Sequence, residues 1–507
     1  MQSLSSKNVM LFPTYEFLVF FVIVFAIGSF IKKQITAYKY YLICVSLIFY
    51  SFWGLQFLQS LFIDIVINYL IIESIERTPY KKQFLFIGIV TNLFYLGFFK
   101  YYNFFTDSLY AALNNFHIQA SFQTLQILTP IGISFYTFRI ISHLVDCYRN
   151  QLKCPSLLDY TVYITYFPQV ISGPISRADK FYIQLNSQEK YNYQIESVMI
   201  LIISGLFKKY TLSSFLFNFT QLPFQLPEQY SSFDLILATL AYSCLIYVDF
   251  SGYSDLANAI SALLGFQPIQ NFNMPYRAQS LQEFWRRWHI SLSEWLRDYL
   301  YIPLGGGRKS NFQKYFNLLL TMIIAGFWHG AGLNFIIWGT LHGIGLILKH
   351  ICDDVIKSFQ SQKNTTPTRL DSSIKNKKSL KVPVKYSHQP HQAFYLAIFN
   401  WLCTFIFVNI CWIFFNTSSW ETAIKFLRRI FDLNSNHQLS QLNSWQLYII
   451  FAMVFIMNFS GDKISHFCEK ALTHKNLILQ TIFASSTLYV VFRLGPNTVP
   501  PFIYFNF

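Results

Sequence analysis

Long apolar stretches separated by short polar and basic segments recur along the whole chain. They fall at residues 11–31, 40–59, 60–75, 83–100, 126–147, 160–175, 196–216, 232–250, 314–327, 333–349, 393–415, 446–459 and 477–493. A helix needs about 20 predominantly apolar residues to cross a membrane, so most of these stretches predict membrane spans. The expected fold is an all-α polytopic membrane protein with about 11–13 transmembrane or re-entrant helices.

Two of the apolar stretches contain residues that a lipid-facing helix does not tolerate. Residues 126–147 include Pro130, Gly132, His143 and Asp146, and residues 160–175 include two prolines, a glutamine and a glycine. Broken or polar segments at membrane depth persist only where they are buried in protein or line a wet cavity. The pattern therefore predicts a protein with a polar interior.

Two polar segments divide the second half of the chain. Residues 351–392 carry eight Lys/Arg against three Asp without a periodic apolar face, which predicts a flexible cytoplasmic loop. It separates a core at 1–350, with its chemistry at 249–342, from C-terminal helices at 393–507. Residues 419–432 place apolar side chains at helical spacing with basic ones between them, which predicts a helix at the membrane interface.

Composition excludes a soluble enzyme. Hydrophobic residues make up 53% of the 507 residues and charged residues 12%, where soluble domains average about 25% charged. The net charge of +15 lies beside apolar stretches, so it indicates cytoplasmic loops of a cell (inner) membrane protein rather than nucleic-acid binding. Because Lys32 and Lys33 follow the first apolar stretch, the N-terminus is expected outside. A short inside loop is expected around Asp462–Lys475, which places the C-terminus outside as well.

The segment 249–304 is unusually rich in charge and aromatic side chains. Asp249 and Asp255 bracket a Ser-Gly-Tyr-Ser sequence that predicts a turn, and a structural role beside a buried basic group and a role in catalysis both fit them. Four-residue spacings predict a Glu283–Arg287 pair and one helix face shared by Trp285, His289 and Ser293. The charged side chains of this segment are expected to face protein or water rather than lipid: Arg286, Arg287, Arg297 and Asp298.

Two histidines lie inside apolar stretches, and each is followed by glycine. They are His329, after Trp328, and His342. Burial favours a neutral imidazole, which is the form that a general base needs. Each histidine also fits a purely structural role as a hydrogen-bond partner between helices. No spacing typical of a zinc site or a disulfide framework accompanies them, so no metal is expected.

Several motifs together resemble the membrane-bound O-acyltransferases. They are FWRRWHISLSEWLRDYLYIPLGG, GFWHG, DFSGYSDLA, YFPQVISGPISR, ISFYTF and the C-terminal PFIYFNF. The resemblance covers about residues 40–507 except the hydrophilic loop. It is strongest for the branch that contains alginate O-acetyltransferase and the D-alanyl transferase of teichoic acids. This family implies a ring of helices around a thinner centre, where funnels from the two faces meet.

The resemblance also implies a site. His329 of GFWHG corresponds to the essential histidine of the family, His289 of WRRWH to its second histidine, and His342 to a less certain third participant. Trp328 and Asn334 are expected to support them, together with the charged and aromatic residues of the segment 249–304 singled out above. The chain has Asn416 where the family has a basic residue, so that contact is missing or supplied elsewhere.

The implied activity is O-acetylation of a cell-surface, alginate-like polysaccharide. A hydroxyl attacks the thioester of acetyl-CoA, the expected donor, while His329 takes its proton; His289 orients His329 or hydrogen-bonds the acyl carbonyl. A one-step transfer and a covalent acyl-enzyme both fit. The expected partner is a periplasmic acetyltransferase or another polysaccharide-modifying protein. D-alanylation of teichoic acid and peptidoglycan O-acetylation remain alternatives, and a transporter is disfavoured because no internal repeat is visible.

Overall fold

The computed structural model describes residues 10–118, 125, 127–308, 310–364, 390–432, 440–473, 477–496 and 503. Within these ranges the chain forms helices and no strands. The first third contains α1 (Tyr15–Ile31), α2 (Ile35–Ser51), α3 (Leu55–Arg77), α4 (Lys81–Asn115), α5 (Ile133–Tyr148), α6 (Leu157–Thr165), α7 (Phe167–Val170) and α8 (Ala178–Asn186).

The remaining elements begin with a long helix that contains a π-helical turn. They are α9 (Ile195–Leu206), η1 (Phe207–Leu212), α10 (Ser213–Asn218), α11 (Gln221–Gln225), η2 (Pro227–Gln229), α12 (Ser232–Leu263), η3 (Pro275–Arg277), α13 (Leu281–Arg287), α14 (Ile290–Leu296), η4 (Arg297–Tyr301), α15 (Asn311–His329), α16 (Leu333–Asn364), α17 (Pro390–Asn416), α18 (Trp420–Ile430), α19 (Trp445–Leu472) and α20 (Leu477–Leu494).

Seven of the described helical segments are long and apolar enough to cross a membrane. They lie in α3, α4, α9 to α10, α12, α16, α17 and α19. This confirms the prediction of an all-α polytopic membrane protein. The apolar helices α1 and α2 have 17 residues each. That is about 25 Å of helix, which is shorter than the about 30 Å of hydrocarbon in a bilayer.

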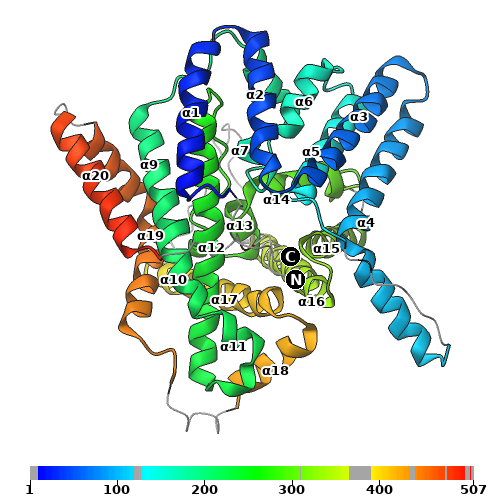
Figure 1. The fold of residues 1–507 in the computed structure, drawn as a ribbon. Coiled ribbons are helices and arrows are strands. Elements are labelled where there is room, and N and C mark those ends of the chain that lie inside the picture. The colour runs from blue at the N-terminus through cyan, green and yellow to red at the C-terminus, as the bar shows by residue number, and fades with distance from the viewer. Residues whose placement is uncertain are drawn as a thin grey trace, which may run out of the picture.

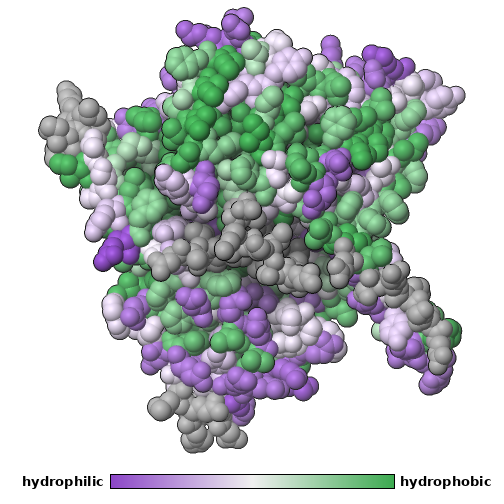
Figure 2. All heavy atoms as spheres, viewed as in Figure 1, coloured by the Kyte–Doolittle hydropathy of each residue, from purple (hydrophilic) through white to green (hydrophobic). Residues whose placement is uncertain are grey.

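Helix α12 is a long, central helix around which other helices pack (Figure 1). It packs against α9, η1, α10, α17, α18 and α19, and most of its side chains are buried. In Figure 1, α1 runs along the upper half of α12, α2 to α4 stand to the right, α9, α19 and α20 stand to the left, and α13 to α16 lie in the middle. Figure 2 shows hydrophobic side chains over the upper part of this face, with hydrophilic side chains above and below them.

Two faces follow from the order of the helices. The α1–α2 and α3–α4 connections lie at the top of Figure 1 and carry Lys32, Lys33, Lys81 and Lys82; we call this the basic face. The beginning of α1 and the α2–α3 turn lie at the other ends of these helices, toward the opposite face. The turn is made at Gly54, whose φ of +134° favours glycine. The predicted stretches 40–59 and 60–75 therefore had the wrong boundary.

Helix α12 also corrects a prediction. The expected Ser-Gly-Tyr-Ser turn is helical, and α12 continues through it to Leu263. The glycine serves packing instead, since a Cβ on Gly252 would lie 2.8 Å from the backbone nitrogen of Lys209 in η1. Two close-packed helices need a small residue at such a contact.

Three hydrophobic stretches continue as helices into polar sequence. Helix α4 runs to Asn115, and α16 runs to Asn364, so residues 351–364 are helical rather than the start of a flexible loop. Lys349 and Asp353 form an ion pair one turn apart that supports this extension. Helix α19 likewise covers Asp462 to Leu472, which were expected to form a loop. Residues 365–389 of the predicted loop lie outside the described residues.

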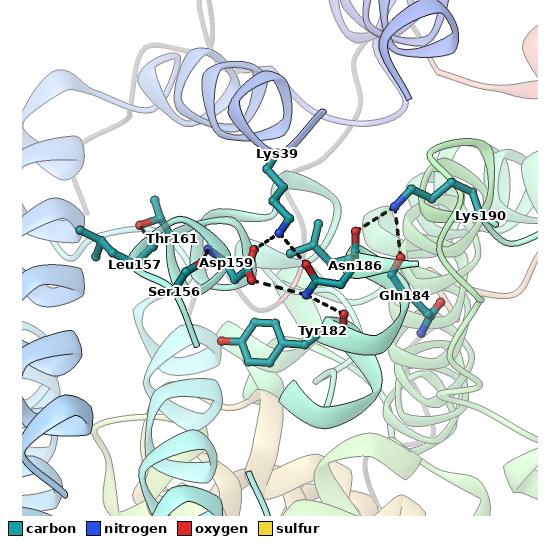
Figure 3. A network of polar contacts seen from close by, with 10 residues as sticks. Lys39, Ser156, Leu157, Asp159, Thr161, Tyr182, Gln184, Asn186 and Lys190 are labelled. Carbon is teal, nitrogen blue, oxygen red and sulfur yellow. Dashed lines mark hydrogen bonds and ion pairs between the residues drawn. The ribbon is translucent and has the colours of Figure 1, made fainter. Parts of the chain in front are cut away.

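A polar network near the basic face joins α2, α6 and α8 (Figure 3). Lys39 forms an ion pair with Asp159 at 2.5 Å and donates a hydrogen bond to the side-chain oxygen of Asn186 at 2.5 Å. Lys190, in the connection after α8, donates to two carbonyl oxygens near the end of that helix. Burial, aided by the nearby charge of Lys39, lowers the pKa of Lys190 to about 8. These polar contacts hold the short helices α6 and α8 against α2.

Candidate active site

His329 is the last residue of α15. The helix ends there because Gly330 is extended, with φ −162° and ψ 156°, and the chain turns back into α16 at Leu333. A side chain at Gly330 would collide with the ring of Phe335, so this sharp reversal needs glycine. The reversal places the histidine at the tip of a helical hairpin inside the protein, where its side chain is 4% exposed.

Aromatic rings surround the His329 imidazole. Its ring centroid lies 4.9 Å from Trp328, 5.1 Å from Trp338 and 5.1 Å from Phe415. Trp338 also contacts the next histidine, with 4.8 Å between its centroid and that of His342. The indole therefore separates the two imidazoles, and His342 contributes to the wall of the site from one turn further along α16.

His342 is held from α13. The indole N–H of Trp285 donates a hydrogen bond to Nδ1 of His342 at 3.3 Å. Since Nδ1 accepts, the proton of a neutral His342 lies on Nε2. The predicted participation of Trp285 is thus indirect, because its contact is with the third histidine.

His289 lies at a break between two helices. It has φ +41° and ψ 56°, between the end of α13 at Arg287 and the start of α14 at Ile290. The predicted helix face shared by Trp285, His289 and Ser293 is therefore wrong. The break aims the imidazole inward against Phe250, whose ring centroid lies 4.7 Å away, and leaves His289 fully buried. The predicted Glu283–Arg287 pair in α13 is confirmed at 2.9 Å.

Asn271 fixes the proton on His289. Its side-chain oxygen accepts hydrogen bonds from the backbone N–H of Ser291 at 3.3 Å and from the Ser291 hydroxyl at 2.8 Å, so it is the oxygen and not the nitrogen that faces His289. The Nδ1 atom of His289 lies 3.1 Å from the same oxygen and must donate to it. The lone pair of a neutral His289 is then on Nε2, which has no hydrogen-bond partner among the described residues.

This tautomer bears on the two predicted roles of His289. A neutral imidazole with its proton on Nδ1 offers Nε2 only as an acceptor. It cannot donate a hydrogen bond to a developing oxyanion, but it can accept one from a neighbouring group. The arrangement favours an orienting role over stabilisation of the acyl oxygen.

A cavity of about 3040 Å³ reaches His329. Its walls come from the start of α1, the α2–α3 turn, the segment before α5, α10 and α11, and the connection after α17, so it lies toward the face opposite the basic face. His289 and His342 do not line this cavity. Lys100, Trp328, Asn334 and Asn416 lie on its wall with His329.

Asp249 and Asp255, the two aspartates of α12 that the sequence singled out, both form ion pairs. Asp249 pairs with Lys209 at 2.5 Å and accepts a hydrogen bond from the backbone N–H of Ile503 at 3.0 Å. Asp255 pairs with Lys208 at 2.6 Å. Asp249 thus ties the C-terminal segment to the core, and the buried basic partners are lysines of η1. The other residues of PFIYFNF lie outside the described residues.

The remaining residues singled out in the sequence are Asn334, Asp298, Arg297 and Arg286. The amide nitrogen of Asn334 donates to the carbonyl oxygens of Phe414 and Thr417, which closes the end of α17 beside the cavity. Asp298 pairs with Arg177 at 2.7 Å and with Arg297, whose side chain is 57% exposed. Arg286 is exposed. No cluster of metal-binding side chains occurs among the described residues.

Sequence reasoning missed the residues that hold the histidines. Asn271, Trp338 and Lys100 come from three separate segments, and none of them belongs to a motif quoted above. Lys100 alone gave a signal, as a charged residue at the edge of a long apolar stretch. Such a residue is a candidate for function.

Comparison with known proteins agrees with this geometry. The model of the membrane-bound O-acyltransferase family matches residues 17–368. The chain belongs to this family. It is 35% identical over 463 residues to the peptidoglycan O-acetyltransferase of Helicobacter pylori, covering 84% of this chain and 80% of the relative. It is 32% identical over 538 residues to the probable alginate O-acetylase AlgI of Azotobacter vinelandii, covering 98% and 100%.

A third relative matches a shorter part of the chain. The teichoic acid D-alanyltransferase of Streptococcus thermophilus is 30% identical over 240 residues, which cover 44% of this chain and 58% of that protein. The protein is therefore a multi-pass membrane acyltransferase, and its full-length likeness is to O-acetyltransferases rather than to the D-alanyl branch.

Proposed function

We propose that the protein transfers acetyl groups from cytosolic acetyl-CoA to hydroxyl groups of a cell-surface glycan, with an alginate-like polysaccharide as the first candidate. One observation carries this proposal. Of the four histidines that are buried among the described residues, His143, His289, His329 and His342, only His329 lines the large cavity that lies away from the basic face. An acceptor that enters this cavity can reach His329, whose imidazole lies among aromatic side chains.

His329 acts as the general base in this scheme. The acceptor hydroxyl oxygen attacks the thioester carbon while His329 takes the hydroxyl proton. The tetrahedral intermediate then expels the thiolate, which takes the proton back from the imidazolium and leaves as the thiol. His289 has the orienting role in this scheme, in which its Nε2 accepts a hydrogen bond from the imidazolium N–H that forms on His329 during transfer. Capture of the acyl group on a side chain before transfer remains compatible with the same residues.

The donor approaches from the basic face. Three arginines gather there around η4, where Arg149, Arg177 and Arg297 contact Asp298, and the guanidinium group of Arg177 lies 4.5 Å from the ring of Tyr299. Connections rich in Lys and Arg are cytoplasmic in membrane proteins. Guanidinium groups on that side suit the phosphate groups of acetyl-CoA, which would compete with the Asp298 carboxylate that now pairs with Arg177 and Arg297. The inner membrane of a bacterium is the proposed location, with the cavity and the N-terminus outside.

The size of the cavity supports a macromolecular acceptor or partner. At about 3040 Å³ it exceeds the about 300–1,000 Å³ of common small-molecule pockets. A periplasmic acetyltransferase that receives the acetyl group, or the glycan itself, fits this space. Peptidoglycan is the second candidate acceptor, because the relative from Helicobacter pylori is named for it. D-alanyl transfer to teichoic acid is a third, with the weaker likeness described above.

The test replaces His329 in cells that lack the natural gene. Alkali-released acetate is measured separately on secreted polysaccharide and on purified peptidoglycan, with released D-alanine as the third readout. His329→Ala is expected to leave less than about 1% of the transfer, since loss of a general base costs about 10²–10⁴-fold. Membrane abundance is checked by immunoblot. Full acetylation with His329→Ala, together with an inactive His342→Ala, would contradict the assignment of the base.

A further inference from the structure

The end of α15 leaves carbonyl oxygens that the helix itself does not use. The last turn of any helix lacks the following N–H groups, and here the chain leaves the helix at Gly330. Two neighbouring residues of α4 supply the missing donors. The Tyr101 hydroxyl donates to the carbonyl oxygen of Phe327 at 2.7 Å. The Lys100 ammonium group donates to those of Trp328 at 2.7 Å and His329 at 2.9 Å.

The Lys100 ammonium group is fully engaged within the protein. A lysine has three N–H donors, and the third points to the hydroxyl oxygen of Ser134 in α5 at 3.4 Å. The group forms no ion pair with a carboxylate among the described residues. Its positive charge is stabilised instead by the carbonyl end of α15, which is the negative end of that helix. Since no donor is left over, Lys100 is unsuited to bind a substrate directly.

We propose that Lys100 is a positioning residue for acyl transfer. It ties α4 and α5 to the tip of α15 and thereby fixes the imidazole of His329 on the wall of the cavity. The proposal rests on the proposed role of His329 as base. It assigns to α4, which carries none of the motifs quoted above, the task of holding the catalytic helix end.

Because Lys100 is charged, its removal should change the pH dependence of the rate, which the loss of an uncharged hydrogen bond would not do. Burial is the main reason that the pKa of His329 lies well below its ordinary value, and His289 from the α13–α14 break, Lys100 from α4 and His342 from α16 lower it further. The side chains of α16 and α17 against the ring, Trp338 and Phe415, carry no charge. A cation beside an imidazole opposes its protonation. Removal of the cation therefore moves the acid limb of the pH–rate profile to higher pH.

The experiment compares four variants of the full chain in membranes, with [¹⁴C]acetyl-CoA as donor and alkali-labile label on added polymannuronate or peptidoglycan as product. Lys100→Met is expected to lower kcat by about 10²-fold, the effect of a base displaced by about 1 Å, without changing KM for acetyl-CoA. Its acid limb should move to higher pH. Lys100→Arg keeps the charge and several donors, so it should recover most of the rate and keep the limb in place.

Tyr101→Phe is the matched control, because it removes one hydrogen bond to the same helix end but no charge. It should leave the acid limb unchanged. Equal rates and equal profiles for Lys100→Met and the unmodified chain would overturn the proposal, and so would a lost rate with an unmoved limb and no rescue by arginine. An active His329→Ala would instead overturn the proposed base. If unmodified membranes do not use acetyl-CoA, the proposed donor is wrong, and the same four variants are compared by alkali-released acetate from intact cells at each external pH.

Discussion

Gly326 of α15 and Gly339 of α16 face each other backbone to backbone, one turn before His329. A Cβ on Gly326 would lie 3.1 Å from the Cα of Gly339 and would collide with the carbonyl oxygen of Phe335. The absence of both side chains lets the two helices pack closely enough for Trp338 to contact His329 and His342 at once. The geometry of the site thus depends on two residues that have no chemistry of their own.

Gly326→Ala should therefore destabilise the hairpin and reduce activity. Overpacking of a close contact costs about 1–3 kcal/mol. The matched control is Gly97→Ala in α4, where no described atom lies within 4 Å of an added Cβ. Thermal unfolding in one detergent, read alongside acetyl transfer, compares the two. Equal melting temperatures for both variants would show that the close approach of α15 and α16 is not required.

Replacement of Asn271 should lower the rate of acyl transfer. Asn271→Leu removes the acceptor that keeps the proton of His289 on Nδ1, so Nε2 no longer presents its lone pair in a fixed direction. A drop in kcat of about 10²-fold is expected from the lost orientation. Asn271→Asp retains the oxygen and should restore most of the rate. An Asn271→Leu enzyme with normal kcat would refute the orienting role of His289.

The two lysine–aspartate pairs of η1 and α12 predict unequal costs. The side chains of Lys209 and Asp249 are 2% and 3% exposed, whereas those of Lys208 and Asp255 are 12% and 20% exposed. Removal of one partner from a buried pair costs about 3–5 kcal/mol because the remaining charge is left in an apolar interior. Asp249→Ala should lower the melting temperature in detergent strongly, and Asp255→Ala less. The reverse order would mean that the C-terminal segment does not depend on Asp249.

The class of fold and the candidate histidines His289, His329 and His342 could be predicted because each is indicated by a short, local sequence pattern. Apolar length marks a span, and an imidazole followed by glycine in an apolar stretch marks His329 and His342. No local pattern indicates the left-handed backbone conformation of His289. A left-handed residue between two short helices looks like one continuous amphipathic helix, so the face shared by Trp285 and His289 was predicted wrongly.

The holding residues escaped prediction for a different reason. Asn271, Trp338 and Lys100 act across contacts between segments far apart in sequence, and helix packing alone decides which of them meet. Helix ends in polar sequence were also missed, as in α16 beyond residue 351. There, ion pairs one turn apart such as Lys349–Asp353 stabilise helix that hydropathy does not indicate.

The last prediction concerns which face of the protein lies in the cytoplasm. Lys153 is exposed in the connection after α5, at the basic face, and Ser418 is exposed on the wall of the cavity. Because basic connections are cytoplasmic, a membrane-impermeant maleimide should label Ser418→Cys in intact spheroplasts and Lys153→Cys only after permeabilisation. The unmodified chain, with its eight cysteines, gives the background, and permeabilised cells show that both positions react. Labelling of Lys153→Cys alone in intact spheroplasts would place the His329 cavity in the cytoplasm, and the donor and acceptor sides of the mechanism would have to be exchanged.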